Sequence, residues 1–124
     1  MKPDDLIAAA FHEDLPRIDV TTDRLQLGDR PGRAHLIAKE DLVLSGTEIF
    51  VKCFTHLSHD VSVKWYFSDG EAVLKKQKVA RLDGPLVVLL KAERIALNFI
   101  AMLSGVATLT QKFVQKVSHT KTKI

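Results

Sequence analysis

The sequence predicts an α+β fold in which a small, mainly antiparallel sheet packs on helices. Its hydrophobic pattern runs in the order helix, short strands, helix, antiparallel strands and two helices, without the regular strand–helix alternation of a doubly wound sheet. The chain has 124 residues, of which 46% are hydrophobic and 27% charged. This composition is typical of a globular domain. The length allows one hydrophobic core but not a complete (β/α)₈ barrel, which needs roughly 250 residues.

In the first half of the chain, apolar spacing and turn residues predict two helices and at least one strand. Apolar residues at helical spacing predict a helix over residues 3–12. Glycines and prolines predict a long connection over 14–32, with a short strand at about 21–27. Residues 33–40 alternate between apolar and polar and predict a strand, whereas residues 47–57 carry the apolar stripe of a helix.

The second half is expected to begin with antiparallel strands. Residues 60–67 are rich in valine and aromatic side chains, which favour strands. The turn signal Ser68-Asp69-Gly70 follows and is typical of a connection between antiparallel strands. Residues 71–84 predict one or two further short strands.

Two helices are expected after Pro85, a residue that suits the start of a helix. From Leu86 to Leu103 the chain is apolar on almost every side, so we expect this helix to be largely buried. Ser104-Gly105 predicts a break, and the second helix is expected to run to about Lys116. Residues 120–124 predict the start of a strand.

The charge balance favours small acidic ligands over nucleic acid. Lysine and arginine number 18 against 15 aspartate and glutamate residues, which gives a net charge of +3. This mild excess falls short of the concentrated basic face of a nucleic-acid-binding protein. The sequence has no apolar stretch long enough to span a membrane and no signal peptide, so we expect a cytoplasmic protein with no membrane partner.

The single cysteine, Cys53, excludes an intrachain disulfide. It lies on the apolar stripe of the helix predicted at 47–57, so we expect a core thiol rather than a nucleophile. The sequence contains no phosphate-binding loop, dinucleotide fingerprint or zinc motif, and we predict no metal ligands in it. A self-contained active site is therefore not visible.

The most informative feature is a polar stripe on the apolar helix at 86–103. At about 100° per residue, Lys91, Arg94 and Asn98 fall on one narrow face. An unpaired cation is costly to bury, so this face must meet solvent, a partner charge or a ligand. Two interpretations stay open: a solvent-exposed stripe or an arginine–carboxylate pair on the one hand, and an anion site in a cleft, where the guanidinium binds a carboxylate, on the other.

At this stripe the sequence resembles a known family. Residues 92–110, AERIALNFIAMLSGVATLT, are similar to the "ER-x-x-LN…LSGIAT" signature of quinolinate phosphoribosyltransferases. Residues 13–22, 34–46 and 69–85 also resemble patterns of that family, namely "ED…GD-x-TT", "A-x-I-x-AKE-x-G-x-x-AG" and "DG-x-x-V-x-x-G-x-x-x-A-x-x-x-G".

The resemblance implies a two-domain enzyme. Residues 1–104 would form its N-terminal hammerhead-like α+β domain, and residues 105–124 the first helix and strand of an α/β barrel. The family's catalytic "TRKT" motif is expected beyond Ile124. This pentosyltransferase condenses quinolinate with phosphoribosyl pyrophosphate, using Mg²⁺, and yields nicotinate mononucleotide, carbon dioxide and pyrophosphate for NAD biosynthesis. The chain alone is therefore expected to be inactive.

The resemblance also implies a role for one residue of the stripe. The family's matching arginine, here Arg94, binds substrate carboxylate in the active site of a neighbouring subunit, which implies a homodimer or higher homo-oligomer. Helix geometry makes Lys91 and Asn98 candidates for a supporting role. The Mg²⁺ ligands and the catalytic residues are expected outside this chain.

Two alternatives remain at this stage. Molybdenum-transport accessory proteins resemble this enzyme and share the "ER-x-x-LN…SG-x-AT" string, so the fold could serve another substrate. The domain could also act only in dimerisation and scaffolding, with an exposed apolar helix surface pairing the subunits.

Overall fold

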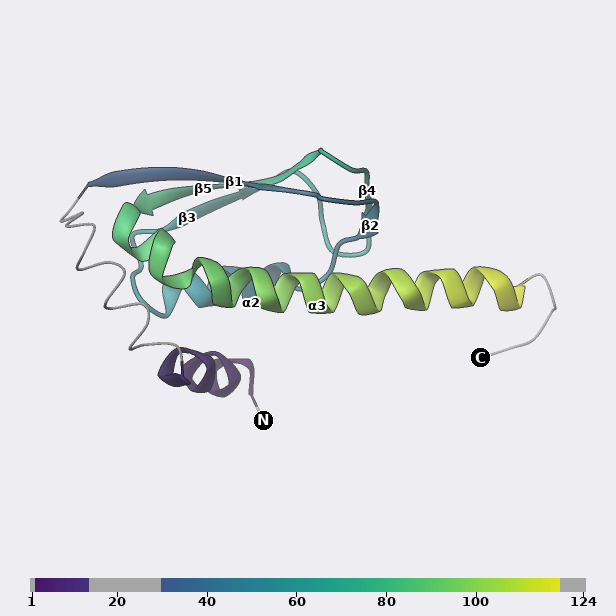
Figure 1. Ribbon diagram of the computed structural model, residues 1–124, viewed down its shortest axis with the longest axis horizontal. Helices are drawn as coiled ribbons and strands as arrows, with labels where there is room; N and C mark the ends of the chain where they lie inside the picture. The colour runs from purple at the N-terminus through teal and green to yellow at the C-terminus, as the bar shows by residue number, and fades with distance from the viewer. Residues whose placement is uncertain (1, 14–29, 119–124) are drawn as a thin grey trace.

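The computed structural model describes residues 2–13 and 30–118 and has a layered α+β architecture (Figure 1). A three-stranded sheet lies on one side of two helices, α2 (Thr47–Thr55) and α3 (Leu86–Ser118). The N-terminal helix, residues 3–13, lies on the other side of these helices. The predicted fold class is confirmed.

The main sheet has the order β1-β5-β3 and is antiparallel throughout. Its strands are β1 (Pro31–Ile37), β5 (Lys78–Pro85) and β3 (Ser62–Trp65). The register places Ala34 and Val63 on either side of Leu82. Because side chains alternate across a strand, this apolar row faces the helices while the next row faces away from them.

The turn at Ser68-Asp69-Gly70 does not join two paired strands, so this part of the prediction was wrong. The strand that follows it, β4 (Ala72–Val73), pairs with β2 (Leu42–Val43) in a separate two-stranded ribbon. The turn instead contacts α2, because Asp69 Oδ1 accepts the backbone N–H of Thr47 at 3.2 Å, at the start of that helix. The turn therefore caps a helix.

The expected helix break at Ser104-Gly105 was also wrong, because α3 continues through it to Ser118. Buried Ser104 uses its hydroxyl to bond the backbone of Ser45, accepting its N–H and donating to its carbonyl, both at 3.0 Å. Thr108, one turn later, accepts the N–H of Val43 at 2.9 Å. A mid-helix glycine costs only about 1 kcal/mol relative to alanine, so these bonds and the surrounding packing outweigh Gly105.

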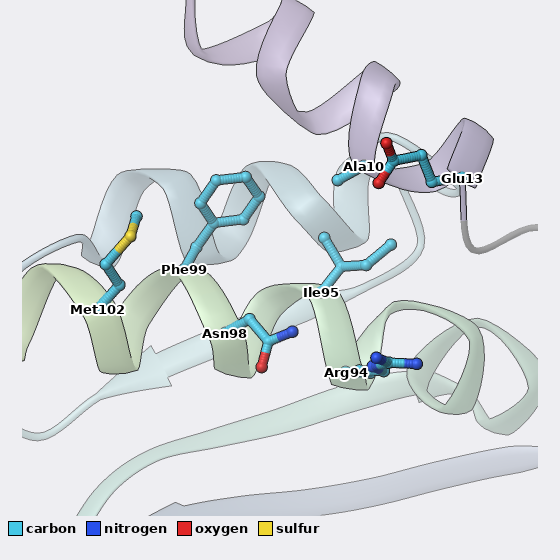
Figure 2. Close-up of a pocket in the computed structure, with 7 residues that line it drawn as sticks. All are labelled: Ala10, Glu13, Arg94, Ile95, Asn98, Phe99 and Met102. Carbon is cyan, nitrogen blue, oxygen red and sulfur yellow. The ribbon is translucent and has the colours of Figure 1, made fainter.

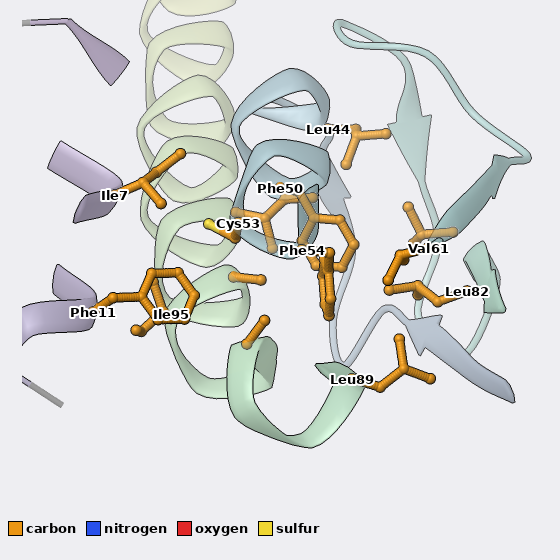
Figure 3. Packing of buried hydrophobic residues seen from close by; sticks show 14 of the residues in the cluster. Ile7, Phe11, Leu44, Phe50, Cys53, Phe54, Val61, Leu82, Leu89 and Ile95 are labelled. Carbon is orange, nitrogen blue, oxygen red and sulfur yellow. The ribbon is translucent and has the colours of Figure 1, made fainter. Parts of the chain in front are cut away.

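The core lies between the sheet and the helices and extends to the N-terminal helix (Figure 3). Phe50, Cys53 and Phe54 of α2 are buried there, as the predicted stripe requires. Ile7 and Phe11 are the anchors of the N-terminal helix, at 1% and 4% exposure. The core also contains Leu44, Val61, Val73, Val79, Leu82, Leu89, Ala92, Ile95, Ala96 and Ile100.

The remaining predicted elements have mixed outcomes. The strand predicted at 33–40 is β1, which starts earlier, at Pro31. The strands predicted at about 21–27 and at 120–124 lie outside the described residues. The domain boundary expected at residue 104 falls within α3 and stays a prediction.

Two glycine substitutions test the continuity of α3 and its contact with the turn before α2. We expect Gly105→Ala to stabilise the protein by about 0.5–1 kcal/mol, because a Cβ there meets nothing within 4 Å and the position is helical. We expect Gly46→Ala to destabilise it by more than about 1 kcal/mol, since φ is +96° and the new Cβ would lie 2.7 Å from Leu103 Cδ1. Urea unfolding of both variants measures the effects, and a destabilising Gly105→Ala would contradict a continuous helix.

A second prediction concerns the outer face of the sheet, where Arg33 Nε lies 2.6 Å and Arg81 Nε 3.0 Å from the carboxylate of Asp83. The hydrogen bond from Arg33 lowers the pKa of Asp83. A lowered pKa in the folded state stabilises the fold above the unfolded pKa of about 3.9, and that contribution is lost as the pH falls through the folded pKa. Asp83→Asn should therefore lower the urea midpoint at pH 7, with the difference from wild type shrinking below about pH 4. An equal difference at neutral and acidic pH would contradict this prediction.

Candidate functional site

A groove runs between the N-terminal helix and the first half of α3 (Figure 2). We call it the Arg94 groove, and its volume is about 410 Å³, within the range of small-molecule sites. Its lining residues are Ala10, Glu13, Arg94, Ile95, Asn98, Phe99 and Met102.

The groove brings together two of the three residues singled out in the sequence. Arg94 and Asn98 both line it and are exposed, and one helical turn separates them by about 6 Å along the axis. Lys91 is half-buried and does not line the groove. Arg94 and Lys91 each already have an interaction partner within the chain. The structure is therefore compatible with both interpretations of the polar stripe, an internal pair and an anion site.

α3 presents these polar groups because its opposite face is anchored in the core. Ile100 is 5% exposed, and Ala92 and Ala96 are fully buried. Since successive residues on a helix are rotated by about 100°, burial of one face leaves Arg94 and Asn98 on the open side. The orientation of the groove residues thus follows from the packing of α3.

Glu13 is a groove residue that the sequence did not single out. It is the last described residue of the N-terminal helix and stands across the groove from Ile95 (Figure 2). Packing of Ile7 and Phe11 places it there, and Phe11 also stacks on His56 with ring centroids 5.0 Å apart. Glu13 is far from Arg94 in the sequence, so no spacing rule predicts that the two residues line the same groove. Only the "ED" pattern at 13–14 distinguishes this position in the sequence.

The described lining of the groove offers groups that can bind a charged ligand. It offers a guanidinium, an amide, a carboxylate and an apolar wall of Ile95, Phe99 and Met102. A guanidinium can bind a carboxylate through two parallel hydrogen bonds. Among residues 2–13 and 30–118, the lining contains no histidine, cysteine, serine or lysine.

Other chemical groups of the described residues do not form a second site. Cys53 has no exposed surface, and burial raises the pKa of its thiol to about 12, which confirms a core thiol. Within residues 2–13 and 30–118, no three histidine, cysteine, aspartate or glutamate side chains gather where a metal could bind. The helices in these ranges are also too short or too polar to cross a membrane.

A larger groove, of about 550 Å³, lies along the second half of α3. It is bounded by residues 36–42, Leu44 and Val79 on one side and by residues of α3 between Leu97 and Lys112 on the other. Its surface is mainly apolar, with Ile37, Leu97 and Leu109 exposed.

Comparison with known proteins gives a consistent result. Residues 19–104 match the model of the quinolinate phosphoribosyltransferase N-terminal domain. The chain is 32% identical over 114 residues to a probable nicotinate-nucleotide pyrophosphorylase [carboxylating] of Bacillus subtilis, covering 92% of this chain and 39% of that protein. It is 33% identical over 109 residues to a mitochondrial quinolinate phosphoribosyltransferase [decarboxylating] of Nicotiana tabacum, covering 87% of this chain and 31% of that protein.

A solved structure agrees in fold. The nicotinate-nucleotide pyrophosphorylase from Francisella tularensis superposes with a TM-score of 0.80 at 30% identity, covering 96% of this chain and 43% of that chain. This chain therefore spans 31–43% of the length of these three proteins.

The burial of Cys53 gives a prediction for its reactivity. We expect a disulfide reagent such as DTNB to leave the native protein unmodified at pH 8 and to react at once after denaturation, because the thiol is buried and protonated. Absorbance of the released thiolate measures the reaction. Rapid stoichiometric modification of the native protein would show that Cys53 is accessible.

Proposed function

Because this chain belongs to the quinolinate phosphoribosyltransferase family through its N-terminal domain, we propose that it forms part of an enzyme of NAD biosynthesis. The enzyme transfers the phosphoribosyl group of phosphoribosyl pyrophosphate to quinolinate. Its products are nicotinate mononucleotide, carbon dioxide and pyrophosphate. We place it in the cytoplasm, although the Nicotiana tabacum relative is named as mitochondrial.

The observation that carries this proposal is the placement of Arg94 with Asn98 on the open side of the groove. Quinolinate carries two carboxylates, and a guanidinium remains protonated at every relevant pH. Arg94 would hold one carboxylate and neutralise its charge, so it acts by positioning rather than by proton transfer. Asn98 would add a hydrogen bond from one turn further along, and Lys91 a positive charge from one turn before.

We further propose that Arg94 acts in the active site of a neighbouring subunit of a homodimer or higher homo-oligomer. The second half of α3 offers an apolar surface that a neighbouring subunit or the rest of the proposed barrel would bury: Met102, Val106, Leu109 and Phe113 are 58–69% exposed. Their spacing of four, three and four residues places them in one apolar seam. Such a seam favours burial against another protein surface.

Mg²⁺ is not assigned to any residue described in this chain. These residues hold no group of three potential ligands, so they do not fit a metal site. Its ligands are proposed to lie elsewhere in the intact enzyme.

A test of this function is substitution of Arg94 in the intact enzyme. We expect Arg94→Ala to raise KM for quinolinate and to lower kcat/KM by at least about tenfold. Hydrogen bonds between charged groups are worth about 1.5–3 kcal/mol, and 1.4 kcal/mol is a factor of ten. Steady-state formation of nicotinate mononucleotide is the measurement, and Arg94→Lys should retain only part of the activity because lysine lacks the planar fork.

Lys64→Ala is the matched control, since it removes one positive charge from the far face of the sheet. An unchanged kcat/KM in Arg94→Ala would refute the assigned role and would favour a scaffolding function or a different substrate. The inactivity expected of the 124-residue chain alone stays a prediction, which the same assay decides.

A further inference from the structure

The outer face of the main sheet carries two arginines that share one carboxylate. Arg33 Nε lies 2.6 Å from Asp83 Oδ1, and Arg81 Nε lies 3.0 Å from Asp83 Oδ2. Arg33 is opposite Asp83 in the register of β1 and β5, and Arg81 precedes Asp83 by two residues on β5. All three side chains therefore point to the same face of the sheet, and we call them the arginine clamp.

The shared carboxylate orients both guanidinium groups. Nε is the guanidinium nitrogen nearest to the main chain, so a contact through Nε leaves the terminal Nη nitrogens further out from the sheet. The side chains of Arg33 and Arg81 are 61% and 34% exposed, so small solutes can reach both of them. The hydrogen bond between Arg33 and Asp83 raises the pKa of the guanidinium and lowers that of the carboxyl, so both groups stay charged at neutral pH.

The clamp lies on an open face of the sheet. Within residues 2–13 and 30–118, the helices all lie on the other side of this sheet (Figure 1). His35, opposite Arg81 on β1, and Ser62, opposite Asp83 on β3, border the clamp and are exposed. Both side chains can donate hydrogen bonds. Because the oxygens of Asp83 already accept bonds from the two arginines, the groups left for a ligand are mainly donors, which favour an anion.

We propose that the arginine clamp binds a small phosphate dianion, free or as a monoester, with Arg33 and Arg81 each bonding one of its oxygens. Guanidinium groups match the geometry of phosphate oxygens, and a phosphate monoester carries nearly two negative charges at neutral pH. The clamp and its border contain no apolar side chain that could form the hydrophobic centre of a protein interface, so a small anion fits better than a protein partner. This site lies on the opposite side of α3 from the Arg94 groove and is independent of the proposed function.

Asp83 is a positioning residue that has two opposing effects on phosphate binding. Its charge repels the ligand by about threefold in affinity, the factor for a unit charge and a dianion about 6 Å apart in water at physiological salt. Holding a long side chain in place before binding favours affinity by roughly two- to tenfold for each side chain. Orientation of two arginines therefore outweighs the repulsion.

Titrations of this chain followed by NMR of the backbone amides and of the arginine Nε–H groups test this inference. Glycerol 3-phosphate is the dianionic probe, and dimethyl phosphate is the tetrahedral monoanion for comparison. At pH 7.5 and constant ionic strength we expect a Kd of about 1 mM for glycerol 3-phosphate and binding at least about threefold weaker for dimethyl phosphate. The largest shifts should be those of Arg33, Arg81 and their strand neighbours. A third titration with inorganic phosphate shows whether the free ion or the ester is the better ligand, and tight binding of either supports the clamp.

Variants separate the clamp from a general attraction by positive charge. Arg33→Gln and Arg81→Lys should each weaken binding of glycerol 3-phosphate by about fivefold, and Arg81→Lys does so without loss of charge, because lysine lacks the planar fork. Lys64→Ala is the matched control. It removes a positive charge from the same face, but Lys64 Nζ lies over the ring of Tyr66, 5.6 Å from its centre, so the affinity should change by less than about twofold. Asp83→Asn makes the face more positive but releases both guanidinium groups, and it should weaken binding by about two- to threefold.

Unchanged or tighter binding in Asp83→Asn overturns the inference, because attraction by charge alone predicts that result. An equal loss in Lys64→Ala and in the two arginine variants overturns it as well, as does the absence of shifts at the clamp when the probes are added to the wild-type chain. Urea unfolding of each variant confirms that the affinities are compared between folded proteins.

Discussion

The arrangement of this domain depends on two hydroxyl groups of α3 that bond the backbone at β2. The hydroxyl of Thr108 accepts a hydrogen bond from the N–H of Val43. The hydroxyl of Ser104 accepts one from the N–H of Ser45 and donates one to its carbonyl. Left without partners in a partly buried place, such groups would cost on the order of 1–3 kcal/mol each. These bonds join the turn before α2 to the middle of α3. There, Gly46 approaches the side chain of Leu103 so closely that no Cβ fits without displacement.

The placement of the helices and of the site follows from this junction. With its start held against α3, α2 directs Phe50, Cys53 and Phe54 into the core between the sheet and the helices. α3 in turn buries Ala92 and Ala96, whose small side chains allow close approach. The polar groove residues Arg94 and Asn98 lie on the remaining face of α3. Packing that involves no ligand therefore determines where Arg94 points.

The sequence predicted the elements whose signal is local. The alternation around Ala34 and Leu36 and the stripe through Phe50 and Phe54 each appear within a few residues, and both elements are confirmed. The prediction of a helix break was wrong because the hydrogen-bond partners of Ser104 and Thr108 lie 59 and 65 residues away in the sequence. A prediction from neighbouring residues alone takes account only of the serine and the glycine, which favour a turn.

The same distinction applies to the groove. Arg94 and Asn98 share a helix, so periodicity alone placed them on one face. Glu13 lies near the other end of the chain, and the burial of Ile7 and Phe11 places it at the groove, so no spacing rule relates it to Arg94. The pairing of β2 with β4 was missed for a similar reason, because strands of two residues carry no periodic signal.

The unbroken course of α3 has a consequence for how variation in this protein is constrained. Arg94 and the apolar seam from Met102 to Phe113 belong to one helix, so their angular relation is set by the number of residues between them. Inserting one residue there would turn the seam by about 100° relative to the guanidinium, whereas seven would nearly restore the original phase. The number of residues in this stretch therefore sets the angle between the two surfaces, and an insertion keeps them aligned only when its length is close to a whole number of helical turns.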